Sequence, residues 1–90
     1  MISVEFDQEK SRSNLEKHGI DFDEAKRLWE DQFRVIIPAT CTDEKRWILI
    51  GRIGSECWTV VFTVRKPNIR IISVRKSRRN EEEVYFRRGI

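Results

Sequence analysis

Residues 58–76 carry the sequence WTVVFTVRKPNIRIISVRK, which contains two apolar runs separated by a turn signal. Aromatic and β-branched residues fill 58–64 and 69–74, a composition typical of β-strands. Lys66-Pro67-Asn68 between the runs is a turn sequence. Because consecutive strands with short links usually pair as antiparallel neighbours, this stretch predicts two adjacent antiparallel strands.

The chain before this pair predicts three more strands, each bounded by polar or glycine-containing segments. Pro38 is expected to end the middle one, because proline cannot donate a ladder hydrogen bond. The three strands and their links are residues 2–6, 33–37 and 47–50, with a polar loop at 39–45 and a glycine-containing link at 51–56.

A first helix is predicted between Asp7 and Gly19. The Asp7 carboxylate can accept from free amides of the first turn, and Gly19 offers a left-handed stop after His18. Leu15 is the one large apolar residue in this helix, so its inner face must be mostly polar. The polar residues at spacings of three and four from Leu15 or from one another are Ser11, Asn14 and His18.

Two further helices are predicted from their starts. Asp21 with Glu24 has the form of a capping box, and the helix that follows has an ordinary core stripe. Asn80, with Glu83 three residues on, is expected to start a last short helix. The core stripe of the middle helix is Phe22, Ala25, Leu28 and Trp29, and the last helix is expected to run through Val84, Tyr85 and Arg88.

The predicted order is therefore β-α-α-β-β-β-β-α, an α+β fold with an antiparallel sheet packed on helices. Ninety residues form one domain, 1–90, with room for one compact core. The large residues expected in that core are Phe22, Trp29, Trp47, Trp58, Val60 and Phe62.

Positive charge gathers toward the C-terminal end. Residues 1–64 hold nine basic and twelve acidic side chains, a net charge of −3, whereas residues 65–90 hold nine basic and three acidic, a net charge of +6. Such asymmetry is the usual footprint of contact with a polyanion. A solvated basic face that binds nothing specific would give the same pattern.

Several classes of protein are disfavoured. Cys41 and Cys57 are too few for a disulfide scaffold and stand in no metal-binding spacing, so reduced thiols in a cytoplasmic protein are expected. The chain has one histidine, and its sequence contains neither a phosphate-binding loop nor a nucleophile elbow. We therefore expect no bound metal and no cofactor. The start of the chain lacks the pattern of a signal peptide, and no apolar run is long enough for a membrane span.

The candidate chemical groups are cations on the strands. Arginine suits this place, because its planar guanidinium can hold two phosphate oxygens at once. Strict alternation of side chains puts Arg75 on the face of Ser73 and Ile71. The same alternation puts Arg70 on the opposite face. Arg65 with Arg70, and Arg75 with Lys76, are expected to form two local clusters.

The chain resembles the BrnT family of bacterial type II toxins over nearly its whole length. Alanine often stands in the family where this chain has Val74, a mild departure. The residues that carry the resemblance are Phe6-Asp7, Lys10, Asn14, Lys17-His18-Gly19, Phe22, Glu24-Ala25, Asp31, Glu44-Lys45-Arg46-Trp47, Ile50-Gly51, Val64-Arg65, RIISVRK at 70–76, Glu83 and Tyr85.

The resemblance implies a RelE-like ribonuclease fold and a toxin that cleaves RNA to block growth. It also implies an antitoxin partner with a ribbon-helix-helix domain. The pair would repress their own operon, so operator DNA is contacted only through the antitoxin. The candidate catalytic residues are Arg65, Arg75 and His18, and the candidate substrate-binding residues are Arg70, Lys76, Arg46 and Tyr85.

Two of these residues keep alternative interpretations. His18 could move a proton during cleavage, or it could hold the end of its helix through hydrogen bonds and the helix dipole. Tyr85 could instead be a core aromatic with its hydroxyl at the surface.

Two hypotheses of function follow. In the first, the domain is a metal-independent endoribonuclease that uses the 2′-hydroxyl of RNA as the nucleophile. In the second, it is a non-catalytic basic module that binds an antitoxin and acts as a transcriptional co-repressor.

Overall fold

A computed structural model describes residues 3–39 and 45–87 of the chain. The described part is an α+β domain, as predicted, with a five-stranded sheet. The strands are β1 (Val4–Glu5), β2 (Val35–Ala39), β3 (Arg46–Ile53), β4 (Glu56–Arg65) and β5 (Asn68–Lys76). The helices are α1 (Gln8–His18), α2 (Phe22–Ala25), the 3₁₀ helix η1 (Lys26–Glu30) and α3 (Arg79–Arg87).

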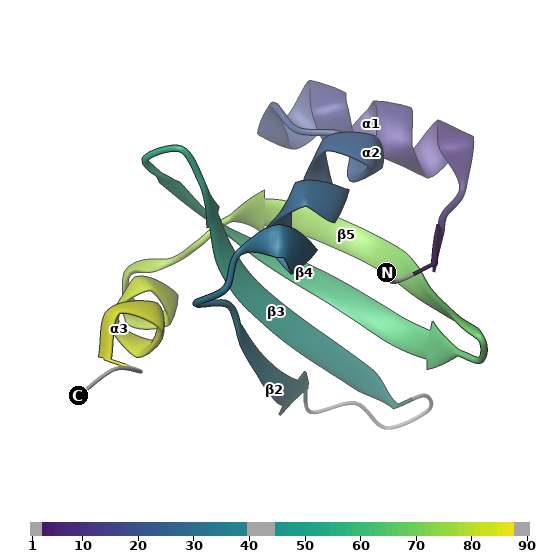
Figure 1. Cartoon of the computed structure of the whole chain (residues 1–90). Helices are drawn as coiled ribbons and strands as arrows, with labels where there is room; N and C mark the ends of the chain where they lie inside the picture. Colours follow the sequence, from purple (N-terminus) through teal and green to yellow (C-terminus); the bar gives the residue numbers. More distant parts are fainter. Residues whose placement is uncertain (1–2, 40–44, 88–90) are drawn as a thin grey trace.

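The sheet has the strand order β1-β5-β4-β3-β2 (Figure 1). From β2 to β5 each strand pairs antiparallel with its neighbour, which confirms the meander predicted from the short links. β1 is the exception, because it pairs parallel with β5 at the far edge. A short β1 covers only the first part of β5, through Val4↔Ile69 and Glu5↔Arg70. The rest of that edge of β5 has no strand neighbour among the described residues.

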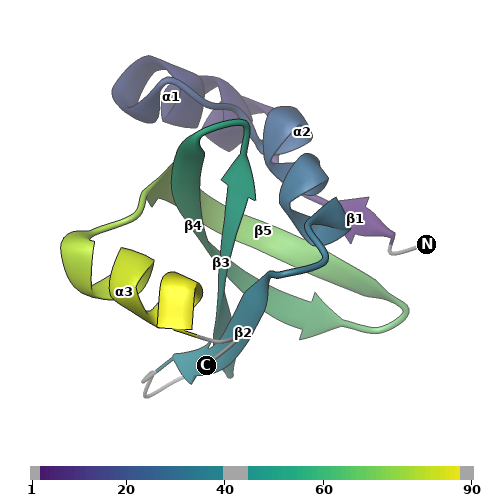
Figure 2. The same cartoon turned by 60° about the vertical axis from the view of Figure 1, so that its left-hand side comes forward.

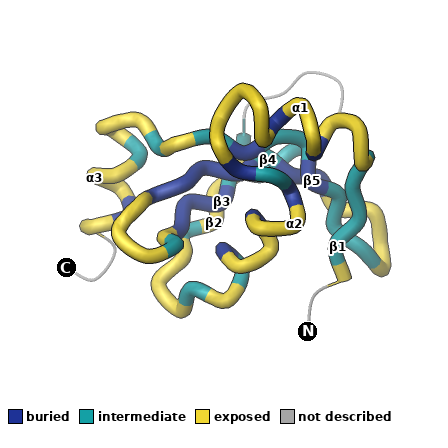
Figure 3. Tube along the Cα trace, turned by 90° about the horizontal axis from the view of Figure 1, so that it is seen from above, coloured by how far each residue is buried: buried dark blue, intermediate teal, exposed yellow. Residues whose placement is uncertain are grey.

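The helices cover the two faces of the sheet unequally. α1, α2 and η1 lie on one face, whereas α3 lies against one end of the other (Figures 1 and 2). The main core forms under the first three helices, and the buried residues, coloured dark blue along the central strands, mark its position (Figure 3). Its buried members are Ile20, Phe22, Ala25, Leu28, Leu49, Trp58, Val60, Phe62, Ile71 and Val74. Of the core residues expected from the sequence, Trp29 and Trp47 are half-buried against this cluster.

A second, smaller core forms under α3. Tyr85 is 2% exposed and packs with Ile50 and Cys57, which point to the face of the sheet opposite the main core. Val35 and Ile48 pack against this group as well. Since this cluster is small, burial of apolar surface alone contributes little free energy to the packing of α3 against the sheet.

The polar inner face of α1 is explained by bonds to backbone. The side-chain amide of Asn14 donates 2.8 Å hydrogen bonds to the carbonyls of Ile20 and Val74, and its oxygen accepts from the Val74 amide at 3.3 Å. Ser11 Oγ accepts from the Phe22 amide at 2.9 Å. Buried backbone groups need such partners, so Asn14 takes the place of a neighbouring strand at the open edge of β5.

The ends of the first two helical segments follow their capping signals. Asp7 accepts from the Glu9 and Lys10 amides, and Gly19 closes α1 with a left-handed φ of 77°. Asp21 accepts from the Glu24 amide at the start of α2. The predicted middle helix is divided, because its second half is the 3₁₀ helix η1, which ends at Glu30 with Asp31 as its C-cap.

Two predicted boundaries are wrong. Pro38 does not end its strand, because it lies inside β2 and pairs with Trp47. β2 is an edge strand, where a proline can turn its missing donor outward. The last helix does not start at Asn80: α3 begins at Arg79, and Glu81 rather than Glu83 accepts from a backbone amide before it, that of Arg78 at 2.7 Å.

The predictions for Ile2, for Cys41, for most of the loop at 39–45 and for Arg88 fall outside the described residues. Among the described helices, none is long and apolar enough to cross a membrane.

Candidate functional site

A bulge in β5 changes which arginines share a face of the sheet. Val61 pairs with Ser73 but the next residue of β4, Phe62, pairs with Ile71, so Ile72 is an extra residue in β5. Strict alternation is broken there. The expectation that Arg70 and Arg75 point to opposite faces is therefore wrong.

The pairing with β4 shows which face both arginines occupy. Arg70 pairs with Thr63 and Arg75 pairs with Thr59, and these threonines are four residues apart on the same side of β4. Thr59 also bonds to Glu81 of α3. Both arginines therefore lie on the face that carries α3.

Arg46 and Arg65 belong to the same face. Arg46 has the same parity on β3 as Ile48 and Ile50, which pack under α3. Arg65 has the same parity on β4 as Thr63, and it pairs with Asn68 across the turn. We call the region formed by Arg46, Thr63, Arg65, Arg70 and Arg75 the arginine face.

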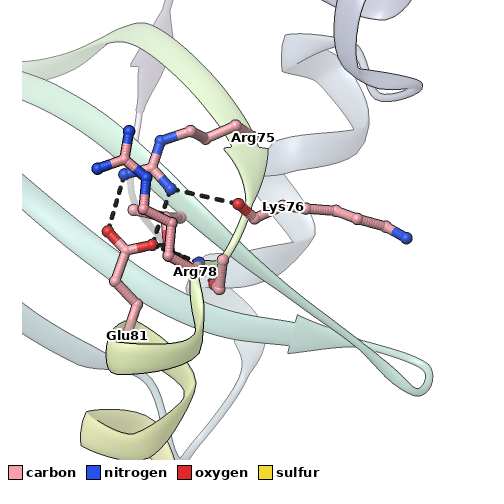
Figure 4. Close-up of polar contacts among 6 residues, drawn as sticks. Arg75, Lys76, Arg78 and Glu81 are labelled. Carbon is pink, nitrogen blue, oxygen red and sulfur yellow. Dashed lines mark hydrogen bonds and ion pairs between the residues drawn. The ribbon is translucent and has the colours of Figure 1, made fainter.

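Arg75 is fixed by an ion pair with α3 (Figure 4). Its Nη1 and Nη2 donate to the two carboxylate oxygens of Glu81 at 2.7 and 2.8 Å, a bidentate arrangement. Nη1 also donates to the Lys76 carbonyl at 3.2 Å. The Glu81 side chain is 13% exposed and that of Arg75 is 26% exposed, so solvent screens this pair less than a surface pair.

Glu81 accepts two more hydrogen bonds, from the Arg78 amide and from the Thr59 hydroxyl. Burial by itself would raise the pKa of the Glu81 carboxyl, but the bonds from Arg75 and the Arg78 amide outweigh it and lower that pKa to about 2. The hydrogen bond from Glu81 in turn raises the pKa of Arg75. Arg75 is thus held as a permanent cation.

The ion pair leaves one edge of the Arg75 guanidinium available. Within the described residues, Nε of Arg75 makes no hydrogen bond, and Nη2 uses one of its two hydrogens for Glu81. The Nε–Nη2 edge is itself a bidentate donor. Arg75 can therefore hold a phosphate while Glu81 keeps its side chain in place.

Arg65 and Arg70 lie at the other end of the arginine face, beside β1. Arg70 Nη1 donates to Glu5 at 3.0 Å, and Asn68 donates to the same carboxylate at 3.1 Å. The hydrogen bonds from Asn68 and Arg70, with the nearby charge of Arg65, lower the pKa of Glu5. The expected proximity of Arg65 and Arg70 is therefore present.

Lys76 does not join Arg75. It pairs with Trp58 on the opposite face of the sheet, and its side chain extends away from the Arg75–Glu81 pair (Figure 4). Its Nζ lies 3.2 Å from Glu56, and both side chains are more than half exposed. The predicted cluster of Arg75 with Lys76 does not form.

Tyr85 lies under α3 rather than at a surface. Its hydroxyl was expected at the surface, but it donates to Asp31 at 2.6 Å. The same carboxylate accepts from the Phe33 and Arg52 amides, both at 2.8 Å. Asp31 thus joins η1, β3 and α3, and Tyr85 is one of the bonds that place α3 beside the arginine face.

His18 lies at the end of α1, on the side of the sheet away from α3. Its side chain is exposed, and among the described residues it makes no hydrogen bond. It lines a cavity of about 340 Å³ together with Lys10, Lys17 and the edge residues Ile72 and Ser73 of β5. The edge of β5 separates His18 from the arginine face.

One comparison identifies the relatives of this chain. A family model described as "Ribonuclease toxin, BrnT, of type II toxin-antitoxin system" matches residues 6–81. The chain belongs to the BrnT family. No curated protein matches it. BrnT membership makes RNA the class of substrate and an antitoxin the partner. The matched region extends from Phe6 to Glu81, so it includes both partners of the Arg75–Glu81 pair.

The residues described in this BrnT chain hold no group of three or more His, Cys, Asp or Glu side chains placed to bind a metal ion. The candidate site of this chain is the arginine face. Two contributors to that site were not identified from the sequence. Glu81 follows two arginines in an acidic run that looks like solvated surface, and Thr63 looks like an ordinary strand residue.

Glu81→Gln tests the bond that holds α3. Because the folded-state pKa of about 2 lies below the ordinary value of 4.5, this carboxylate stabilises the fold above pH 4.5. Its contribution is lost as the pH falls toward 2. At pH 7 the variant should lose about 1.5–3 kcal/mol of unfolding free energy, the range for hydrogen bonds to charged groups. Urea denaturation at pH 7, 4 and 3 should show this loss shrinking with acidity.

Glu82→Gln is the matched control, since Glu82 is an exposed neighbour on α3. It should leave the urea midpoint nearly unchanged at each pH. An equal loss for Glu81→Gln at pH 7 and pH 3 would contradict the assignment.

Proposed function

We propose that this chain is a metal-independent endoribonuclease toxin and that the arginine face is its catalytic surface. The observation that carries the proposal is the alignment of Arg46, Arg65, Arg70 and Arg75 on one face of the sheet. Four cations on one face of a ribonuclease toxin fit a substrate whose backbone is a row of phosphates.

The chemistry needs few titratable groups. RNA supplies its own nucleophile, the 2′-hydroxyl, which attacks the adjacent phosphate and releases the 5′-oxygen of the next nucleotide. The protein has to align the strand and to stabilise negative charge on the phosphorane. Fixed donors aimed at developing charge are often the largest single contribution to catalysis. Arg75 meets this requirement, because Glu81 holds its guanidinium with one bidentate edge unused.

The other side chains have separate roles in this proposal. Arg65 and Arg70 contact phosphates at the end of the sheet next to β1, and Arg46 contacts substrate from β3. His18 moves a proton on RNA that passes from Arg75 over the edge of β5, because a proton-transfer group must reach its substrate; Lys10 and Lys17 supply positive charge around the same cavity. Lys76 and Tyr85, both candidates from the sequence, have weaker support. One points away from the arginine face, and the other has its hydroxyl bound to Asp31.

The proposed antitoxin carries a ribbon-helix-helix domain, as the family resemblance implies. In this arrangement the toxin reaches operator DNA only through that partner. A non-catalytic co-repressor with the same basic face is the competing function, and the product of an RNA incubation separates the two.

Purified protein is expected to cleave RNA in the presence of EDTA. Because the nucleophile is the 2′-hydroxyl, the new ends should be 2′,3′-cyclic phosphates and 5′-hydroxyls, identified by mass spectrometry. RNA that stays intact although the protein binds it would refute catalysis and favour the co-repressor. Cleavage that EDTA abolishes would refute the metal-independent mechanism.

Arg65→Ala and Arg75→Lys should each slow RNA cleavage by about 100- to 1,000-fold, by analogy with the loss of one oxyanion-hole donor. Lysine is the substitution chosen at Arg75, because it keeps a cation beside the buried Glu81 carboxylate. Lysine lacks the bidentate edge with which arginine can hold a phosphate. Cleavage rates at equal concentration of folded protein measure the effect. Arg12→Gln removes an arginine from the exposed surface of α1 and should cleave at the wild-type rate. Wild-type rates in both site variants would reject the assignment.

His18→Gln separates proton transfer from a structural role. Glutamine keeps hydrogen-bonding groups but does not titrate near neutral pH. The variant should keep the wild-type urea midpoint, because His18 is exposed, and should lose about 10²- to 10⁴-fold in rate, the usual contribution of general acid–base catalysis. The pH dependence of the cleavage rate should differ from that of the wild type. An unchanged profile would exclude His18 from proton transfer.

A further inference from the structure

Arg46 holds a buried donor that has no partner. Its Nε is inaccessible to solvent, and no hydrogen bond reaches that atom in the described structure. Within residues 3–39 and 45–87, Arg46 also makes no ion pair. The other arginines with half-buried side chains differ, because Arg70 is paired with Glu5 and Arg75 with Glu81.

An unpaired buried N–H is rare in native proteins, because it gives up hydration without a replacement bond. A cation beside it makes the position more unfavourable. Among the described residues, the fold therefore gains no hydrogen bond and no ion pair from this guanidinium. An acceptor from outside the chain would offset the charge at the terminal nitrogens of the guanidinium, which are not among the buried unpartnered atoms, and a rotation of the side chain would bring Nε within its reach.

The surroundings of Arg46 indicate what that acceptor is. Arg46 immediately precedes Trp47, which pairs with Phe62, so Arg46 of β3 lies opposite Thr63 of β4. On its other side, Thr63 pairs with Arg70 of β5. Thr63 is 3% exposed and directs its hydroxyl to the Lys45 carbonyl at 3.0 Å. Two arginines thus flank one buried threonine, and a tetrahedral oxyanion above it can accept from both sides.

This position is distinct from that of Arg75. Thr63 and Thr59, the β4 partners of Arg70 and Arg75, are four residues apart, roughly 13 Å at ~3.3 Å per residue. Thr63 with its cross-strand partners forms one row and Thr59 with its partners forms another. Between these two rows the same face carries Ile48 and Val61, both half-buried and both apolar. A ligand that spans the rows must alternate charged groups with flat or apolar ones.

We propose that Arg46 and Arg70 form a second phosphate subsite for single-stranded RNA, and that the strand runs along β4 from this subsite to Arg75. A base then lies on Ile48 and Val61 between the two bound phosphates. Single-stranded RNA fits because its unstacked bases are available for apolar contact. The proposal rests on the arginine face being the RNA surface.

Binding of uncleavable RNA tests the subsite independently of catalysis. The probes are a 2′-O-methyl hexanucleotide and the corresponding dinucleotide, measured with wild type, Arg46→Gln and the control Arg12→Gln over a series of salt concentrations. Arg46→Gln should weaken hexanucleotide binding about tenfold and reduce the log–log salt slope by about 0.7, the value for one phosphate on a single strand. Arg12→Gln should change neither quantity.

Length and stability supply two further criteria. Wild type should bind the hexanucleotide more tightly than the dinucleotide, and Arg46→Gln should narrow that difference, because one subsite is lost. The urea midpoint of Arg46→Gln should be no lower than that of wild type, since the substitution removes an unpaired buried donor. If Arg46 stabilised the fold, Arg46→Gln would instead lower the urea midpoint.

Several results would overturn the subsite. They are wild-type affinity and salt slope in Arg46→Gln, a lowered urea midpoint that accounts for the lost binding, or a hexaglutamate peptide that binds as tightly and loses as much on substitution. The last result would assign the position to an acidic protein. Failure of the proposed function is separate: intact RNA in EDTA, with Arg46-dependent binding preserved, refutes catalysis and keeps the subsite.

Discussion

The bidentate bond between Arg75 and Glu81 is the contact on which the position of α3 beside the arginine face depends. α3 has a small apolar contact with the sheet, so its position relies on polar bonds at its start and, through Tyr85 and Asp31, further along. The same bond fixes the direction of the Arg75 guanidinium. The ion pair therefore both attaches α3 to the sheet and orients the Arg75 guanidinium. The low pKa of Glu81 keeps this ion pair formed at neutral pH.

The two faces of the sheet carry different kinds of side chain. One face is packed under α1, α2 and η1, where buried Asn14 and Ser11 satisfy backbone groups and a large apolar cluster supplies stability. The other face is covered at one end by α3, and the remainder carries arginines. Because the stabilising contacts lie mainly on the packed face, cations with unused donors are tolerated on the other. Arg46 is the clearest case of this.

Much of the fold could be predicted from local signals, and much of the site could not. Asp7, Gly19 and Asp21 mark helix ends, and the sequence at 58–76 defines β4 and β5, because these signals act within a few residues. The bulge at Ile72 depends on pairing with another strand, so alternation placed Arg70 on the wrong face. Glu81 could not be recognised as the partner of Arg75, since that contact exists only once α3 is folded against the sheet.

The position of Pro38 inside β2 affects how the molecule behaves toward copies of itself. β2 is the outer strand at its side of the sheet, and the exposed side chains of Ile36 and Ile37 make it apolar. A strand edge that has no neighbour among the described residues can act as a template for pairing with a second copy of the chain. Pro38 removes one of the outward donors that an incoming strand would need. The residue that sequence patterns assign to strand termination instead lies within the edge strand, where it disfavours pairing with a second copy.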